Sequence, residues 1–344
     1  MKIYEVGGCV RDRLLGVQPK DFDYVVVGSI EQEMLDLGFQ KVGKGFPVFL
    51  KDGREYALAR KERKTGPGYY GFDTVFTPDV TLEQDLQRRD LTINSIAYDR
   101  ETNQIIDPFN GEADLALGVL RHTSEAFAED PVRVLRTARF AARYGFIVAD
   151  ETFELMRKIV HELDMVPQER IWAEFEKGLM EVQSYKMFHA LEQCNAFSVD
   201  ALKSYNSNCV DNLTNVKPSN DIAVRFALIC DQFEDEDFVR CCIPTNCADL
   251  GSYINKHYDS LLFYKSSSRE FRLKLLYSLN VFSRPQLIEK CFEVLHVRTD
   301  YGIDDIIRED IKSVVSIDAA TIAAKCKTGE EIKAKLFLAR LAVM

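Results

Sequence analysis

The hydrophobic pattern changes along the chain, and this change limits the folds that the chain can adopt. In the first 60 residues, short β-branched segments alternate with segments whose apolar residues recur every three or four positions, which predicts strands mixed with helices. We expect strands at 2–6 and 22–27, and Asp52-Gly53 between two apolar runs predicts a hairpin. From Asp130 onward almost every segment has helical spacing. The sequence therefore predicts an α+β fold, in which a small mixed β-sheet is followed by helices.

Two helix starts carry specific signals. Thr81 and Gln84 have the spacing of a capping box. Asp130 is a suitable N-cap because Pro131 follows it at the first helical position. Further helices are expected at 151–162, 168–181 and 184–194.

The stretch 60–80 has a different character. Four basic residues within 60–64 precede a segment rich in Gly and Tyr, which predicts a mobile loop that contacts a charged ligand. A plain solvated loop is the alternative interpretation.

Composition is that of an ordinary globular protein, with 46% hydrophobic and 28% charged residues among 344. The net charge of −10 argues against general binding of nucleic acid, so such a partner would require local basic patches. One such patch is 255–290, which holds seven Lys and Arg against three acidic residues.

The chain carries no signal for export or for a membrane. We find neither a secretory leader nor an apolar run of the ~20 residues that a membrane span needs. The nine cysteines form no CxxC pair, and the spacing of Cys241, Cys242 and Cys247 does not fit the usual zinc sites. We expect free thiols and a cytoplasmic protein.

Asp21 and Asp23 stand at the start of an expected strand. Side chains at i and i+2 share one face of a strand, and two neighbouring carboxylates repel each other unless a cation lies between them. Mg²⁺ prefers one or two carboxylates together with phosphate oxygens. The pair is therefore a candidate magnesium site, the alternative being a solvated strand end.

Gly7-Gly8 lies between an expected strand and an expected helix, and Arg11 follows one turn later. Glycine lets the backbone approach a phosphate closely, and an arginine can pair with its oxygens. Together with the two aspartates, this spacing predicts a nucleotidyl-transfer site. Arg88-Arg89-Asp90 adds a second arginine for a triphosphate and an acceptor for a ribose hydroxyl.

Four arginines, at 133, 136, 139 and 143, fall on one face of one helix. Such a row requires a bound anion or acidic neighbours. Asp130 and Arg133 could also read a base, since a carboxylate accepts from an amino group and a guanidinium donates to a ring nitrogen. Cytosine and adenine present that pair of groups, whereas uracil and guanine present the reverse. The pattern therefore predicts use of CTP and ATP without a nucleic-acid template.

Four stretches in this order resemble the motifs of the class II tRNA nucleotidyltransferases, the bacterial CCA-adding enzymes. They are residues 6–12, 20–23, 88–99 and 129–133. The segments 46–50, 55–66 and 169–172 also resemble that family rather than the related poly(A) polymerases. The resemblance extends from residue 1 to about residue 195.

The resemblance implies a role for each matching residue. Asp21 and Asp23 match the catalytic pair that binds metal, and Gly8 and Arg11 match the residues that hold the triphosphate. Glu55 is a candidate third carboxylate. The remaining nucleotide-binding positions are Arg89, Asp90 (ribose), Glu129, Asp130 and Arg133 (base selection), Arg136 and Arg139.

The resemblance also implies a division into domains and an activity. We expect a nucleotidyltransferase head at 1–128, a helical neck at 129–200 and a helical body and tail at 201–344 that bind tRNA. The expected reaction adds C, C and A to the 3′ end of tRNA with Mg²⁺ as cofactor. The chain has no adjacent His-Asp pair, so we do not expect the phosphohydrolase domain of several relatives. Partial C or A addition, poly(A) synthesis and a non-catalytic tRNA-binding protein are the alternatives.

Overall fold

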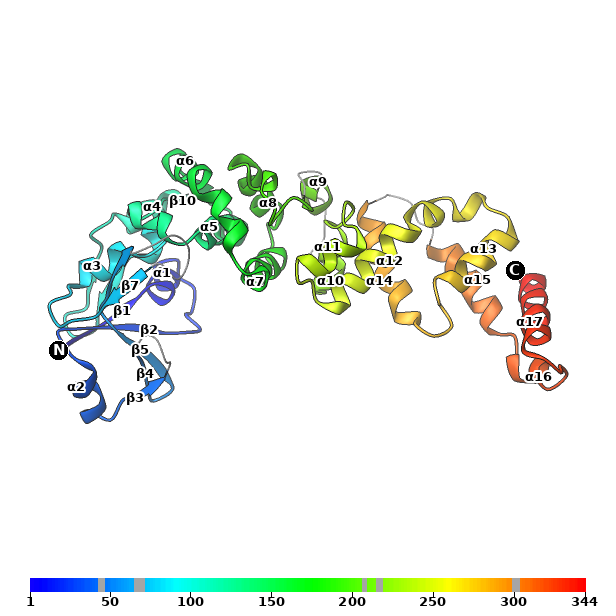
Figure 1. Cartoon of the computed structure of the whole chain (residues 1–344), viewed down its shortest axis with the longest axis horizontal. Coiled ribbons are helices and arrows are strands. Elements are labelled where there is room, and N and C mark those ends of the chain that lie inside the picture. Colours follow the sequence, from blue (N-terminus) through cyan, green and yellow to red (C-terminus); the bar gives the residue numbers. More distant parts are fainter. Residues whose placement is uncertain (43–46, 65–71, 206–208, 215–218, 299–303) are drawn as a thin grey trace. The chain divides into compact units, whose positions relative to one another are not determined.

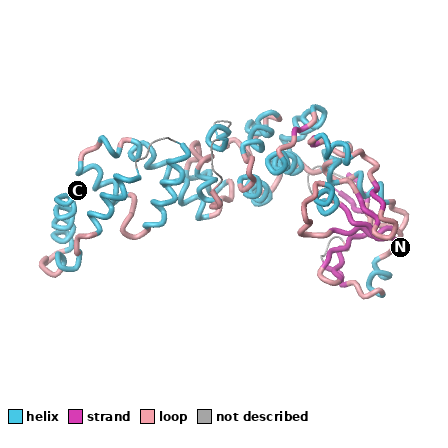
Figure 2. The backbone as a smooth tube through the Cα atoms, turned by 180° about the vertical axis from the view of Figure 1, so that it is seen from behind, coloured by secondary structure: helices cyan, strands magenta, loops and turns pink. Residues whose placement is uncertain are grey.

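The computed structural model describes residues 1–42, 47–64, 72–205, 209–214, 219–298 and 304–344 (Figure 1). The chain forms two compact units, Met1–Lys203 and Ser204–Met344. The first begins with a mixed sheet and continues in helices, and the second is built of helices. Figure 2 shows this change along the chain, which confirms the predicted α+β order. The division at residues 128 and 200 remains a prediction.

The main sheet has seven strands in the order β3-β4-β5-β2-β1-β8-β9. Only β2 and β5 pair in parallel; the other neighbours are antiparallel. The predicted hairpin joins β4 to β5, with Asp52 and Gly53 both at positive φ. The strands are β1 (Lys2–Val6), β2 (Asp23–Val27), β3 (Gln40–Val42), β4 (Val48–Lys51), β5 (Arg54–Leu58), β8 (Ala97–Asp99) and β9 (Gln104–Ile106).

Both faces of this sheet are covered by apolar side chains. Val25 and Val26 of β2 belong to different core clusters, because successive side chains of a strand point to opposite faces. Leu86 of α3 (Leu82–Gln87) packs in the cluster of Val25, and Met34 of α2 (Glu31–Asp36) packs in that of Val26. A six-residue helix is too short to be stable alone, so this burial holds both helices in place.

The predicted capping box is present at the start of α3. The Thr81 hydroxyl accepts from the Gln84 N–H at 3.2 Å, and the Gln84 side chain accepts from the Thr81 N–H at 3.0 Å. Two N–H groups at this helix end, which have no acceptor within the helix, thereby gain hydrogen bonds.

In the stretch 60–80 the predicted loop is wrong in part. Where a loop was expected, strands β6 (Lys61–Lys64) and β7 (Phe72–Val75) pair antiparallel. The glycine-rich segment 65–71 between them lies outside the described residues.

Helix α4 (Gly111–Leu117) packs closely on the short helix η1 (Thr92–Asn94). A Cβ atom at Gly111 would lie 2.2 Å from the Thr92 carbonyl oxygen, so only glycine allows this approach. The Thr92 hydroxyl also donates to Asp114 Oδ2 at 2.8 Å. These contacts fix η1, which begins two residues after Asp90 in the chain.

The helical part of the first unit begins with η2 (Glu125–Glu129) and α5 (Val132–Tyr144), and α5 packs against α7 and α8. Asp130 Oδ1 accepts from the Val132 N–H at 3.1 Å, so its side chain satisfies the start of this helix as predicted, although α5 begins at Val132 with Pro131 at the N-cap, one residue later than expected. The three helices predicted after residue 150 are present. The remaining elements are β10 (Val119–Leu120), β11 (Ile147–Val148), α6 (Asp150–Ile159), η3 (Val160–Met165), α7 (Gln168–Leu179), α8 (Tyr185–Gln193) and η4 (Ala196–Ser198).

The second unit has its own apolar core and a buried polar contact. The Tyr264 hydroxyl donates to Asp310 Oδ2 at 2.8 Å, and Arg272 Nη1 lies 3.0 Å from the same oxygen. Its elements are α9 (Cys209–Thr214), α10 (Ile222–Ala227), α11 (Asp235–Arg240), α12 (Thr245–Leu262), η5 (Tyr264–Ser266), α13 (Arg269–Ser278), α14 (Pro285–Arg298), α15 (Asp304–Val315), α16 (Ala319–Ala323) and α17 (Gly329–Val343).

Candidate active site

The turn between β1 and α1 (Gly8–Leu14) requires glycine at its first position. Gly7 has φ 71° and ψ −131°, and a Cβ atom there would lie 2.9 Å from Arg89 Nη1. A side chain would therefore strain the backbone and displace this guanidinium. The predicted strand–glycine–helix arrangement is present, and it brings Arg11 and Arg89 to the same region.

Asp23 is the first residue of β2, and Asp21 lies two residues before the strand begins. The parallel pairing of β2 with β5 places Asp23 opposite Glu55. Burial raises the pKa of the Asp23 carboxyl, and the charge of Asp21 raises it further, although Arg89 acts in the opposite direction. Desolvation and the neighbouring Asp21 charge thus both act against ionisation of Asp23, as expected of a partly buried carboxyl beside a second one.

Most of the predicted site residues line one cavity of about 1240 Å³. They are Gly8, Arg11, Asp21, Asp23, Arg89, Asp90, Asp130, Arg133, Arg136 and Arg139. Glu129 is the exception, since it lines a neighbouring cavity of about 430 Å³ with Lys61 and Arg88. The candidate third carboxylate, Glu55, also lines the large cavity.

The walls of the large cavity carry an excess of positive charge. Among the described residues, ten Lys and Arg and seven Asp and Glu line it, in a chain whose net charge is −10. The local positive charge required by a polyanionic ligand is therefore present.

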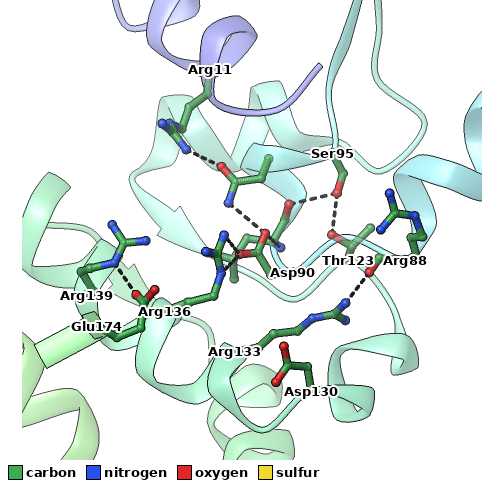
Figure 3. Close-up of polar contacts among 12 residues, drawn as sticks. Arg11, Arg88, Asp90, Ser95, Thr123, Asp130, Arg133, Arg136, Arg139 and Glu174 are labelled. Atoms are coloured by element: carbon green, nitrogen blue, oxygen red, sulfur yellow. Dashed lines mark hydrogen bonds and ion pairs between the residues drawn. The ribbon is translucent and has the colours of Figure 1, made fainter. Parts of the chain in front are cut away.

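The arginines of α5 have acidic neighbours, as the alternative interpretation expected. Arg136 Nε donates to Asp90 Oδ2 at 2.9 Å, and Arg139 Nε donates to Glu174 Oε2 at 2.6 Å (Figure 3). Arg143 Nη2 lies 3.8 Å from Asp12 Oδ2. Arg136 and Arg139 nevertheless line the cavity. Pairing with protein carboxylates therefore orients these two guanidinium groups without removing them from the cavity wall.

Asp90 is the most strongly perturbed carboxyl of this network. Burial alone would raise its pKa, but Arg136, Asn94 and Arg133 favour the ionised form and lower the pKa to about 2. Asp90 is therefore a carboxylate throughout the neutral range and can only accept hydrogen bonds.

Asp130 and Arg133, the pair predicted to read a base, both have protein partners. Arg133 donates to the carbonyl oxygens of Ala126 at 2.5 Å and Arg88 at 2.7 Å. Asp130 Oδ2 accepts from Arg170 Nη2 at 3.1 Å. These contacts fix the orientation of both side chains at the cavity wall, and each group keeps further hydrogen-bonding capacity.

Sequence reasoning missed several residues of the cavity. Glu174 lies on α7 and Arg54 on β5, and no local spacing connects either to the predicted motifs. Asn94 stood inside the matched stretch 88–99, yet it received no role. Its signal was its position four residues after Asp90, which its side chain contacts.

The basic stretch 255–290 is partly neutralised inside the second unit. Four of its seven basic side chains lie within 4 Å of a carboxylate: Arg272, Lys274, Arg284 and Lys290. For Lys256, Lys265 and Arg269, the described residues provide no such ion pair. The excess of free positive charge in this patch is thus smaller than the sequence indicates.

The described part of the chain holds neither a preformed metal-binding cluster nor a membrane-spanning helix. No group of three or more His, Cys, Asp and Glu side chains there is arranged to hold a metal ion by itself. Within the same residues, every helix is too short or too polar to cross a membrane.

Known protein families match both parts of the first unit. The family described as "Poly A polymerase head domain" matches residues 3–121. The family described as "Probable RNA and SrmB- binding site of polymerase A" matches residues 145–199.

Individual proteins match the chain more widely. A multifunctional CCA protein of Chromobacterium violaceum is 39% identical over an alignment 398 residues long, gaps included. The alignment covers 100% of this chain and 98% of that protein. One of Nitrosomonas eutropha is 58% identical over 211 residues, but these cover 59% of this chain and about half, 51%, of that protein. The solved structure of a Thermotoga maritima CCA-adding enzyme complexed with tRNA has a TM-score of 0.71 and 22% identity, covering 99% and 87% of the two chains.

The structural likeness establishes the fold. The 39% sequence identity along the whole chain establishes the family to which the protein belongs. The chain belongs to the CCA-adding family of nucleotidyltransferases.

Proposed function

We propose that this enzyme adds C, C and A in turn to the 3′ end of tRNA, takes them from CTP and ATP, and releases pyrophosphate in the cytoplasm. The observation that carries the proposal is that one cavity holds both the Asp21/Asp23 pair and three arginines of α5, namely Arg133, Arg136 and Arg139. A nucleoside triphosphate bound there has cationic groups for its phosphates, and the carboxylate pair lies in the same cavity. Nucleotidyl transfer needs this combination.

The two aspartates fit a divalent cation. Burial and, to a smaller extent, the charge of Asp21 raise the pKa of Asp23, and positive charge between the two carboxylates would favour their ionised forms. Because the described residues supply only this pair rather than a complete ligand set, phosphate oxygens and water would complete the coordination, as Mg²⁺ prefers. When bound, Mg²⁺ supplies Lewis-acid activation of the attacking 3′-hydroxyl and neutralises phosphate charge.

The chain's own side chains bind and orient the nucleotide. Arg11 and Arg89, beside the glycine turn, are assigned to the triphosphate, with Gly8 allowing close approach. Asp90 is assigned to a ribose hydroxyl, and Arg136 and Arg139 to the nucleotide. Asp130 and Arg133 are assigned to the base, since their rigid acceptor–donor pair suits cytosine and adenine. Glu129, in the neighbouring cavity, is assigned to the support of this pair.

Incorporation into tRNA that lacks CCA tests the proposal. We expect label from CTP, and from ATP once C and C are present, and no label from UTP or GTP. Asp21→Ala should abolish incorporation, and Mg²⁺ should raise the melting temperature of the wild type but not of this variant. UTP incorporation equal to that of CTP would refute the base-selection assignment, and full activity of Asp21→Ala would refute the metal assignment.

The same assay separates the alternatives. The match to a poly(A) polymerase head makes ATP alone with an oligoadenylate primer the necessary comparison. Long poly(A) products would favour a poly(A) polymerase, and arrest after C and C, or addition of A only, would favour a partial activity. Tight tRNA binding without incorporation at any Mg²⁺ concentration would favour a non-catalytic protein.

A further inference from the structure

Arg11, the arginine assigned to the triphosphate, is held by several protein groups. Its Nε and Nη2 donate to Asp12 Oδ1 at 3.0 and 2.7 Å, and its Nη1 donates to Asn94 at 2.5 Å (Figure 3). A guanidinium has five N–H groups, so these bonds leave one N–H on each terminal nitrogen. Arg11 is buried, yet it lines the large cavity. The two remaining N–H groups form a fork that can donate to phosphate oxygens.

Asp12 joins this guanidinium to the end of α5. The Tyr144 hydroxyl donates to the same Oδ1 of Asp12 at 3.2 Å. The other two donors to this oxygen belong to Arg11 itself and move with it, whereas the Tyr144 hydroxyl comes from a different element. The hydroxyl therefore limits rotation of the carboxylate, and with it the direction in which the Arg11 fork points.

The Tyr144 ring also contacts the guanidinium. The Cζ atom of Arg11 lies 5.1 Å from the centroid of this ring and 5.3 Å from the centroid of the Phe140 ring. The two rings are stacked, with their centroids 5.9 Å apart. Aromatic ring faces attract cations at such distances. Helix α5 thus contacts Arg11 through two rings and through a hydrogen bond to its carboxylate partner.

The position of Tyr144 is fixed by its surroundings. Tyr144 is the last residue of α5, which ends at Gly145 with φ 73°, and the Gly145 carbonyl oxygen accepts from Lys186 Nζ of α8 at 2.6 Å. In the part of the chain that the structure describes, neither Asp12 nor Tyr144 lines the large cavity. Both residues therefore act on a nucleotide in the cavity through Arg11.

We propose that Asp12 and Tyr144 are positioning residues that orient Arg11 toward the phosphates, so that the end of α5 sets the affinity of the enzyme for the triphosphate. The start of the same helix carries Arg133, which is assigned to the base. One helix thus supports the groups assigned to both ends of the nucleotide. The inference rests on the proposed function, in which Arg11 holds the triphosphate.

Equilibrium binding to the full chain, with Mg²⁺ and without tRNA, tests this role. CTP and tripolyphosphate carry the phosphates, whereas cytidine carries only the base and the ribose. Tyr144→Phe keeps the ring and the charge and removes the hydroxyl. We expect it to raise the dissociation constants of CTP and tripolyphosphate about fivefold, the scale of one hydrogen bond, and to leave cytidine binding unchanged.

Tyr98→Phe is the matched control. The Tyr98 hydroxyl donates to Asn103 Oδ1 at 2.9 Å, and Tyr98 lies outside the cavity. This variant should bind all three compounds as wild type does.

A second comparison tests whether the hydroxyl acts through Asp12. In an Asp12→Ala background the acceptor is absent, so Tyr144→Phe should change CTP binding little. The loss of charge in Asp12→Ala is common to both members of this pair and cancels from the comparison. Equal effects of Tyr144→Phe in the two backgrounds would overturn the inference.

Three further results would also overturn it. Equal weakening of CTP, tripolyphosphate and cytidine by Tyr144→Phe would show a merely structural role, and wild-type binding of all three would show no role. A wild type that binds cytidine as tightly as CTP would show that the phosphates are not held. Failure of the proposed function is distinguished by a separate result, namely wild type that binds CTP and tripolyphosphate but incorporates no CMP into tRNA.

Discussion

At the scale of single residues, Asp90 shows how the site combines binding with stability. Its carboxyl is enclosed, and Arg136 leads the groups that lower its pKa to about 2 despite burial. In an unfolded chain the pKa of an aspartate is about 3.9. Because the folded value is the lower one, ionised Asp90 stabilises the native state above about pH 4, and this contribution is lost as the pH falls towards 2.

We predict that Asp90→Asn lowers the free energy of unfolding of the first unit by about 2 kcal/mol at pH 7. The difference from wild type should shrink as the pH is lowered from about 4 to about 2. Trp172 is the single tryptophan of the chain and lies in this unit, so its fluorescence during urea denaturation is the measurement. Asp36→Asn, on an exposed position of α2, is the control. Equal stability of wild type and Asp90→Asn at pH 7 would contradict the prediction.

At the scale of elements, the capping box of α3 supports the arginines that follow it. Buried Asp85, on the same helix, accepts from Arg88 Nη2 at 2.9 Å and from Arg89 Nη2 at 3.2 Å. Fraying at Thr81 would therefore disturb both guanidinium groups. We predict that Thr81→Ala lowers the unfolding free energy by about 1 kcal/mol and weakens CTP binding. Thr81→Ser, which keeps the hydroxyl, should restore both, and calorimetry of melting and of CTP binding provides the test.

The Arg139–Glu174 pair joins α5 to α7 in a buried setting. Removing one partner of a buried pair leaves the other charge without compensation, at a cost of about 3–5 kcal/mol. We predict such a loss of stability for Glu174→Ala and a smaller one for Glu174→Gln, which keeps an acceptor. Glu176→Ala, at an exposed position of the same helix, is the control. Similar urea midpoints for Glu174→Ala and Glu176→Ala would count against the prediction.

The sequence predicted those elements whose signals are local. The Thr81 and Gln84 box, the Asp52-Gly53 hairpin and the hydrogen bond from the Val132 N–H to Asp130 each depend on neighbours within a few residues, and all three are present. The pairing of Asp23 with Glu55 and of Arg139 with Glu174 depends on strand order and helix packing. No spacing in a single sequence encodes such contacts. The strands around 65–71 were missed because glycine and basic residues are poor strand signals.

At the scale of the whole molecule, positive charge is concentrated at the large cavity although the protein as a whole is acidic. The cavity carries an excess of cationic side chains in a protein of net charge −10. We predict that the affinity for tRNA falls steeply with salt, because phosphate contacts release counterions, and that unstructured RNA such as poly(U) binds weakly even at low salt. Binding titrations from about 50 to 200 mM salt give the slopes. Equal affinity for tRNA and poly(U) would contradict this arrangement.

The contacts of α5 have a consequence for recombination between related proteins. Arg136 reaches Asp90, Arg133 reaches the Arg88 carbonyl, and the Tyr144 hydroxyl reaches Asp12. A chimera joined near residue 128 must therefore match all of these pairs across its junction. A chimera joined near residue 203, between the two compact units, inherits them intact from one parent. Exchange of the second unit would thus leave every one of these α5 contacts unchanged.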